Sequence, residues 1–128
     1  MDVENLIKHI LDCAVIVRKH LAAGYLEKVY ENALAIELRK HGLLPEQQKI
    51  LPVRYDGILV GDYVADIVVN NEVIIEIKAV RHLNENHEAQ LVNYLTTTGI
   101  DHGVLLNFGN SDKIEIKRKW RIYKTNLK

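Results

Sequence analysis

The chain has 128 residues, of which 48% are hydrophobic and 27% are charged, and its formal net charge at pH 7 is zero. Its length and composition predict a single globular domain over residues 1–128, large enough to bury a hydrophobic core. The zero net charge excludes a global basic field, so any affinity for nucleic acid has to come from local patches.

The cysteine count and the hydropathy pattern indicate where such a protein works. Cys13 is the only cysteine, which excludes an internal disulfide and a cysteine-ligated iron–sulfur cluster within one chain. No stretch approaches the roughly 20 consecutive apolar residues of a membrane span, and the polar N-terminal residues do not resemble a signal peptide. We therefore expect a cytoplasmic protein with no membrane partner.

Hydrophobic periodicity and turn signals predict eight elements along the chain. Gly42 is placed to end the second helix, Asp56-Gly57 is a strong hairpin turn signal, and a bend is expected near Gly61. The elements, in chain order, are two helices, three strands, one helix and two strands: residues 4–21, 25–41, 46–55, 58–69, 72–80, 87–98, 102–108 and 113–123. An antiparallel meander followed by a helical crossover predicts a mixed α/β sheet with helices on its faces.

An acid pair followed by a lysine lies on two of these predicted strands. Asp66 falls in one strand, and Glu76 and Lys78 fall two residues apart in the next. Alternate residues of a strand project from the same face, so Glu76 and Lys78 share one face of a very apolar strand. Charged side chains in such surroundings are usually paired with an opposite charge or bound to a metal.

The register of the hairpin between these strands decides whether Asp66 joins Glu76. A two-residue turn would direct the Asp66 side chain away from Glu76. A three-residue loop over residues 70–72 would pair Val69 with Val73 and place Asp66 opposite Glu76. We predict the second register, because it gathers five aliphatic residues on one apolar face: Ile67, Val69, Val73, Ile75 and Ile77.

Two carboxylates on adjacent strands can hold a hard divalent cation, and the Ile77 carbonyl between the functional side chains could supply a further oxygen. Such an ion would polarise a scissile phosphate and help to deprotonate an attacking water. Lys78 would orient that water or stabilise negative charge in the transition state. The alternative is a structural ion pair of Lys78 with Glu76 or with Asp66.

Two predicted helices carry further polar candidates. Glu27, Tyr30 and Glu31 share one face of the second helix, where Glu27 could bind the ion directly or through water and Tyr30 could contact substrate. The alternative for Glu27 is a solvated helix residue. Gln90 and Tyr94 share a face of the third helix and could contact a phosphate or a base, although Tyr94 could instead lie at the edge of the core.

Four motifs occur together in this chain: Gly24-Tyr25-Leu26-Glu27-Lys28-Val29-Tyr30, Gly61-Asp62-Tyr63 leading to Asp66, Glu76-Ile77-Lys78-Ala79, and His87-Glu88-Ala89-Gln90-Leu91-Val92-Asn93-Tyr94. In this order they resemble the GxxExxY protein family, a branch of the PD-(D/E)XK nuclease superfamily. Asp66 with Glu76-Ile77-Lys78 is similar to the D…ExK signature of the superfamily. Gln90 and Tyr94 match the glutamine and tyrosine found in exonuclease-like branches.

The resemblance implies a restriction-endonuclease-like αβββαβ core, here with an extra N-terminal helix and an extra C-terminal strand. It implies Asp66 and Glu76 as metal ligands, Lys78 as the catalytic lysine and Glu27 as the helix-borne acid of the site. Mg²⁺ or Mn²⁺ is the expected ion. The cysteines that hold an iron–sulfur cluster in some relatives are absent.

The C-terminal segment combines basic and aromatic residues: Lys113, Lys117, Arg118, Lys119, Arg121 and Lys124, with Trp120 and Tyr123 among them. Lys117, Arg118 and Lys119 could neutralise phosphates of a nucleic acid, and the aromatic rings could stack on unpaired bases. The alternative is an edge strand that its lysines protect from aggregation. Such an edge could also pair with a second copy in a homodimer.

These observations support three hypotheses for the function. The first is a metal-dependent nuclease that hydrolyses phosphodiester bonds in DNA. The second is a catalytically silent nucleic-acid-binding or protein-interaction module on the same fold, which the zero net charge favours. The third is a metal-dependent hydrolase of a smaller phosphoester.

Overall fold

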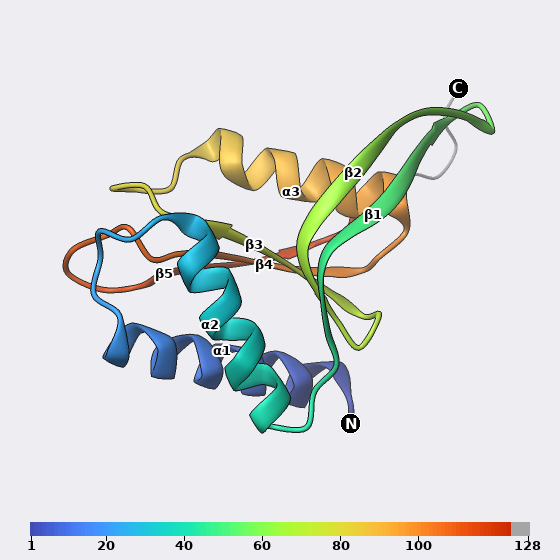
Figure 1. Ribbon diagram of the computed structural model, residues 1–128. Helices are drawn as coiled ribbons and strands as arrows, with labels where there is room; N and C mark the ends of the chain where they lie inside the picture. The colour runs from blue at the N-terminus through green and yellow to red at the C-terminus, as the bar shows by residue number, and fades with distance from the viewer. Residues whose placement is uncertain (124–128) are drawn as a thin grey trace.

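The computed structural model describes residues 1–123, so Lys124 of the basic C-terminal segment lies outside the described residues (Figure 1). Eight elements occur in the predicted order: α1 (Val3–His20), α2 (Glu27–Lys40), β1 (Pro45–Tyr55), β2 (Ile58–Val69), β3 (Val73–Lys78), α3 (Glu85–Thr98), β4 (His102–Asn107) and β5 (Glu115–Trp120). Within the described residues, no helix has the length and apolar character needed to cross a lipid bilayer.

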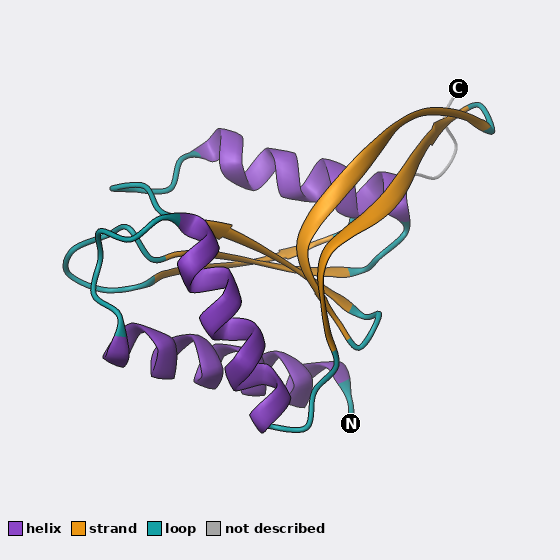
Figure 2. Ribbon diagram, viewed as in Figure 1, coloured by secondary structure: helices purple, strands orange, loops and turns teal. Residues whose placement is uncertain are grey.

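The five strands form one mixed sheet in the order β1-β2-β3-β4-β5. Neighbouring strands are antiparallel except β3 and β4, which are parallel and are connected through α3. Helices α1 and α2 lie on one face of the sheet and α3 lies on the other (Figure 2). This arrangement confirms the predicted mixed α/β fold, with the restriction-endonuclease-like αβββαβ core, the additional N-terminal helix and the additional C-terminal strand.

The β2–β3 hairpin has the predicted register. Val69 pairs with Val73, and the three-residue loop between them contains Asn70 and Asn71 with φ angles of 53° and 57°. Paired residues end at Ile67 and Ile75, because β2 turns away from β3 beyond that point. We call this point the fork, with Asp66 on β2 and Ile77 on β3.

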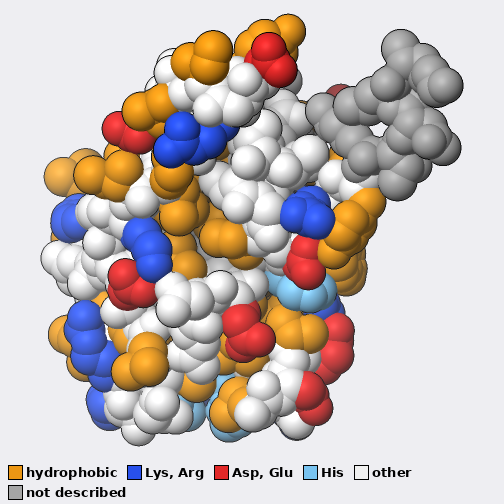
Figure 3. All heavy atoms as spheres, turned by 90° about the vertical axis from the view of Figure 1, so that its right-hand side faces the viewer, with side chains coloured by type: hydrophobic (Ala, Val, Ile, Leu, Met, Phe, Trp, Pro, Cys, Tyr) orange, Lys and Arg blue, Asp and Glu red, His pale blue; other side chains and the backbone are white. Residues whose placement is uncertain are grey.

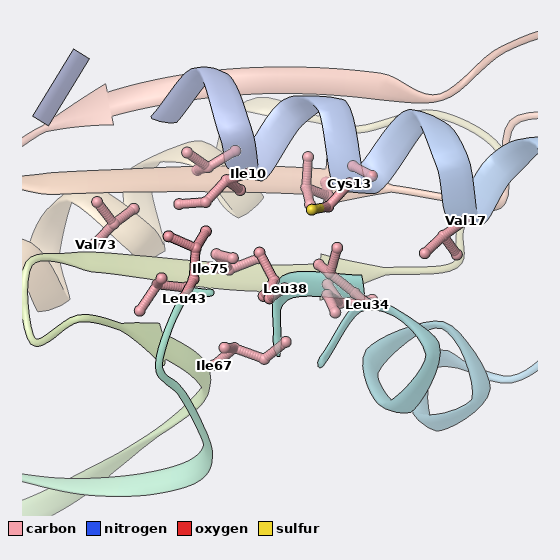
Figure 4. Close-up of a cluster of buried hydrophobic side chains, with 14 of the residues drawn as sticks. Ile10, Cys13, Val17, Leu34, Leu38, Leu43, Ile67, Val73 and Ile75 are labelled. Atoms are coloured by element: carbon pink, nitrogen blue, oxygen red, sulfur yellow. The ribbon is translucent and has the colours of Figure 1, made fainter. Parts of the chain in front are cut away.

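The larger hydrophobic core lies between the sheet and helices α1 and α2. It contains the five aliphatic residues of the predicted apolar face, together with side chains such as Ile10 of α1 and Leu34 and Leu38 of α2 (Figure 4). Complete burial of one such side chain contributes about 1.5–3 kcal/mol. The packing therefore fixes β3 under α2 and brings the first turns of α2 toward the fork.

A second hydrophobic cluster holds α3 on the opposite face, where Leu91 and Leu95 are buried against Ile74 and Leu105. The helix approaches the sheet closely at Gly103, where a Cβ atom would lie 3.0–3.2 Å from methyl groups of both leucines. This close contact fixes the height of α3 above the sheet and places its polar face beside Glu76 and Lys78 of β3.

Strands β1 and β2 continue beyond the sheet as a two-stranded arm, residues 49–65 (Figure 1). The turn at Asp56-Gly57 is confirmed, with φ angles of 53° and 76°, and a bulge at Val60 beside Gly61 accounts for the predicted bend. Large apolar side chains of the arm are exposed, including Tyr55 and Ile58, and hydrophobic atoms are visible at the top of the molecule (Figure 3).

Candidate active site

Asp66 connects β2 to β3 at the fork. One of its carboxylate oxygens, Oδ2, accepts a hydrogen bond of 2.8 Å from the backbone nitrogen of Ile77. The N–H and C=O groups of one strand residue point toward the same side of the strand, so the Ile77 carbonyl is also directed to the β2 side of β3. Burial raises the pKa of Asp66, and the hydrogen bond from Ile77 opposes that shift. The Asp66 carboxylate thus lies on the side of β3 toward which the Ile77 carbonyl is directed.

Glu76 is half-buried, and its Oε1 atom is itself buried and has no hydrogen-bond partner within the described residues. Burial raises the pKa of Glu76 from 4.5 to about 7, Lys78 opposes this shift and the Glu27 carboxylate adds to it. A buried carboxylate oxygen without a partner is costly, and a proton or a cation would relieve that cost. Glu76 therefore behaves as an unsatisfied acceptor.

A cleft of about 240 Å³ lies between β3 and α3, next to the base of the arm. Its lining includes the predicted catalytic residues Glu76 and Lys78 of β3 and the predicted substrate-binding residues Gln90 and Tyr94 of α3. The other lining residues are Tyr63, Val64, His87, Leu91 and Leu105. The rings of Tyr63 and Tyr94 are stacked in parallel, with centroids 3.8 Å apart, so Tyr94 is held in place. The structure thus brings Glu76, Lys78, Gln90 and Tyr94 to one cleft.

Lys78 makes no ion pair with any described residue. The predicted structural alternative, an ion pair of Lys78 with Glu76 or Asp66, is therefore not formed. The ammonium group still influences the neighbouring acid, because it lowers the pKa of Glu76 against the effect of burial. A lysine that lines a cleft beside an unsatisfied carboxylate is available to a ligand.

Helix α2 contributes two carboxylates near the fork, of which one was predicted. Glu27 begins the helix and is exposed, whereas Glu31 is only 3% exposed. Glu31 accepts hydrogen bonds from Lys28, Gln47 and Gln48 at 3.1, 2.6 and 2.8 Å. Both acids raise the pKa of Asp66 and of Glu76, which places them electrostatically within the same site.

Helical spacing predicts Glu31 only as a neighbour of Glu27 on one helix face. Helical spacing does not reveal that Glu31 is buried, and its glutamine partners come from β1 and are not adjacent to it in the sequence. A helix periodicity argument treats the two glutamates alike. Only the packing of α2 against β1 distinguishes the buried acid from the exposed one.

The fork offers oxygen atoms of the kind that suit a divalent cation. Among residues 1–123, no three His, Cys, Asp or Glu side chains converge in an arrangement that could hold a metal. Mg²⁺, however, commonly takes only one or two carboxylates and completes its octahedron with carbonyl oxygens and waters. Asp66, Glu76 with its unpartnered oxygen, and the Ile77 carbonyl fit such a site.

Tyr30 does not face the cleft, and this corrects the prediction that it contacts substrate. Its side chain is fully buried and stacks on Phe108, with ring centroids 4.7 Å apart. Its hydroxyl donates to the Ala22 carbonyl at 2.5 Å and accepts from the Tyr25 nitrogen at 3.1 Å. Tyr30 therefore anchors the loop before α2, and it affects Glu27 only through that loop.

The basic C-terminal strand is an edge strand, as one of its two interpretations predicted. Arg118 donates two hydrogen bonds to Glu4, at 2.6 and 2.8 Å, and Lys119 forms an ion pair with Glu88. Lys117 is exposed and forms no ion pair with any described residue. Of the three predicted phosphate contacts, Lys117 is the one whose charge is free.

Comparison with known proteins now adds to this geometry. The family model of the PD-(D/E)XK nuclease superfamily matches residues 4–119. The chain belongs to the PD-(D/E)XK nuclease superfamily. PD-(D/E)XK nucleases generally use divalent metal ions. Assignment to the GxxExxY branch stays a prediction.

One solved structure shares the fold of this chain. The structure titled "Crystal structure of SSO0001" has a TM-score of 0.58 and 19% sequence identity, over 76% of this chain and 50% of that chain. At this identity the likeness concerns the fold alone, and our chain spans about half the length of that protein. No curated protein sequence matches the chain.

Proposed function

We propose that this protein is a metal-dependent nuclease that hydrolyses phosphodiester bonds in DNA. The observation that carries the proposal is the pairing of Lys78 and Glu76 in one cleft. The Lys78 ammonium group forms no ion pair with any described residue, and the Glu76 carboxylate has a buried oxygen without a hydrogen-bond partner among those residues. Both belong to the D…ExK pattern, and the superfamily match supports the same chemistry.

The proposed site uses the chain's own groups in distinct roles. Asp66, Glu76 and the Ile77 carbonyl would hold Mg²⁺ or Mn²⁺, and Glu27 would add a contact directly or through water. When bound, such an ion polarises the scissile phosphate and makes a bound water more acidic. Lys78 orients the attacking water or stabilises negative charge on the phosphate, and it can do so because none of the carboxylates among residues 1–123 forms an ion pair with it.

The substrate would enter along the α3 side of the cleft. Gln90 can donate to and accept from a base or a phosphate, and Tyr94 presents a ring already held against Tyr63. Lys117 lies on the same face, because Glu76 and Lys117 are both paired with Leu105 on the strand between them. Lys117 would neutralise a phosphate some distance from the reacting one.

A catalytically silent nucleic-acid-binding module is the second candidate. It is favoured by the absence of a converged three-ligand cluster among residues 1–123 and by the zero net charge of the chain. It predicts salt-dependent binding of nucleic acid without metal dependence and without product.

Metal titration and cleavage assays separate these candidates. Mn²⁺ and Mg²⁺ are titrated by calorimetry into the wild type and Glu76→Ala, and labelled single- and double-stranded DNA, RNA and a model phosphodiester are then assayed for cleavage. We expect binding that Glu76→Ala loses, and metal-dependent cleavage of DNA. Turnover of the model phosphodiester with DNA intact would instead select the small-phosphoester hydrolase.

Lys78→Ala tests the role of the lysine, with Lys113→Ala as a matched loss of an exposed lysine outside the cleft. We expect Lys78→Ala to fold and to bind Mn²⁺ but to lose cleavage, while Lys113→Ala retains it. Full cleavage by Lys78→Ala would refute the proposed mechanism.

A further inference from the structure

Gln48 of β1 has a backbone conformation that is unusual for its residue type. Its φ angle is 52°, in the left-handed region that glycine, asparagine and aspartate occupy far more readily than other residues. Gln48 has no paired residue in the β1–β2 ladder, although its neighbours do: Gln47 pairs with Ile67 and Lys49 pairs with Ala65. Strained residues of this kind persist where the surroundings fix them, and they concentrate at functional sites.

Hydrophobic packing does not explain this conformation, because Gln48 is exposed. The side-chain nitrogen of Gln48 contacts two acids, Glu31 and Asp66. The Nε2 atom donates to Glu31 Oε1 at 2.8 Å and approaches Asp66 Oδ1 at 3.4 Å. Gln48 is therefore held chiefly by Glu31 and extends from there toward Asp66.

Glu31 is itself fixed and is not free to act as a ligand. Its Oε2 atom accepts from Lys28 and Gln47, and its Oε1 atom accepts from Gln48. A buried carboxylate that receives three donors is well compensated, and leaving this arrangement would cost those bonds. Glu31 thus serves as a rigid base for the side chain of Gln48.

The two oxygens of Asp66 have separate contacts. Oδ2 accepts from the Ile77 nitrogen at 2.8 Å, and Oδ1 faces the Gln48 amide. Two donors on opposite oxygens define the plane of a carboxylate, whereas one donor leaves it free to rotate. Partners of this kind orient metal-binding carboxylates in proteins, and their loss typically costs 10- to 100-fold in metal affinity.

We propose that Gln48, held in a left-handed conformation and fixed by buried Glu31, is a positioning residue that sets the orientation of the Asp66 carboxylate at the fork. The effect of this positioning role on metal affinity rests on the function proposed above. The effect on the Asp66–Ile77 hydrogen bond does not rest on that function, because the bond exists without any metal.

The chain contains a matched control for this proposal. Gln47 and Gln48 both donate to Glu31, but only Gln48 reaches Asp66. We compare Gln48→Ala, Gln48→Gly and Gln47→Ala. Both variants at position 48 remove the side-chain amide group of Gln48. They differ in backbone strain, because glycine accepts a positive φ angle without penalty.

Amide hydrogen exchange of the metal-free protein gives the first measurement. The Ile77 amide should exchange about tenfold faster in Gln48→Ala and Gln48→Gly, as expected for weakening a bond by about 1.4 kcal/mol. The Leu106 amide in β4, which is paired on both sides, serves as the reference for global opening. Gln47→Ala should leave the ratio of the two rates near its wild-type value, and an unchanged ratio in Gln48→Ala would overturn the proposal.

Calorimetric titration of Mn²⁺ gives the second measurement, and urea unfolding the third. Both position-48 variants should bind Mn²⁺ about tenfold more weakly than Gln47→Ala, although Gln48→Gly should unfold at a higher urea concentration than Gln48→Ala. Equal Mn²⁺ affinity in all three variants would overturn the consequence for metal binding. If the wild type binds no Mn²⁺ but the Ile77 amide still responds, the nuclease proposal fails and the positioning role stands.

Discussion

The Asp66 carboxylate accepts the hydrogen bond of the Ile77 backbone nitrogen at the point where β2 separates from β3. An aspartate proposed as a metal ligand therefore also replaces a missing ladder bond. Ile77 is 1% exposed, so in the folded chain its N–H group depends on Asp66 as its hydrogen-bond partner. The structural and the chemical role of this residue have to be separated experimentally.

Two variants, Asp66→Asn and Asp66→Ala, separate the structural role of Asp66 from its proposed role as a metal ligand. Asn keeps an oxygen that can accept from Ile77 but removes the charge, so it should fold normally and lose Mn²⁺ binding. Ala leaves the Ile77 N–H unpaired, which should lower the free energy of unfolding by about 1–3 kcal/mol. Urea unfolding and calorimetry measure the two effects. Mn²⁺ binding retained by the asparagine variant would show that Asp66 is structural only.

Glu76 should make the stability of the metal-free protein depend on pH. Its pKa is raised by burial from 4.5 to about 7, so between these values the folded state holds a proton that the unfolded chain has lost. The free energy of unfolding must therefore fall as the pH rises through this window. At about 1.4 kcal/mol per pKa unit, the loss amounts to at most roughly 3 kcal/mol.

Urea unfolding in EDTA at about pH 5 and about pH 8 measures this loss, and Glu76→Gln is the control. The glutamine has the size of the protonated acid and cannot ionise, so its stability should change less between the two pH values. Equal pH dependence in the wild type and Glu76→Gln would contradict the shifted pKa.

Much of the site was predictable where it depends on alternation along strands. The apolar face that includes Val69 and Val73 fixed the register, and the register then placed Asp66 beside Glu76 and Ile77. The arrangement around Glu31 was not predictable in this way. Its partners come from a strand whose contact with α2 depends on tertiary packing, and the left-handed conformation of Gln48 has no sequence signal.

The burial of Tyr30 and the ion pairs of Arg118 and Lys119 escaped prediction for a related reason. Helical spacing places Tyr30 on the face of Glu27 but does not reveal which of them is buried. Arg118 and Lys119 meet Glu4 and Glu88, acids that are distant in the sequence. Charge runs show which residues could bind phosphate, whereas ion pairing decides which charges are free.

Tyr30→Phe tests the structural role of the Tyr30 hydroxyl. Removing the oxygen leaves the Ala22 carbonyl and the Tyr25 nitrogen without this partner, and each lost bond should cost about 1 kcal/mol of stability. Thermal unfolding measures the cost. Because the hydroxyl does not line the cleft, DNA affinity of the folded variant should match the wild type, and a marked loss of affinity at unchanged stability would restore the original prediction.

We expect Lys117 to neutralise a phosphate of bound DNA and Arg118 not to do so. A lysine that neutralises one phosphate contributes about 0.9 to the slope of log K against log salt concentration for duplex DNA. Lys117→Ala should therefore lower that slope by about 1 and weaken binding similarly for all sequences. The slope is measured by fluorescence anisotropy with labelled duplex DNA across a salt series, in EDTA to prevent cleavage.

Arg118→Ala is the matched control, because Arg118 lies next to Lys117 but is engaged by Glu4 through two hydrogen bonds. Its removal should leave the slope unchanged and should cost stability only on the scale of a surface ion pair, about 0–1 kcal/mol. If Arg118→Ala lowers the slope and Lys117→Ala does not, nucleic acid approaches the α1 side of β5, and the proposed path along the α3 side of the cleft is wrong.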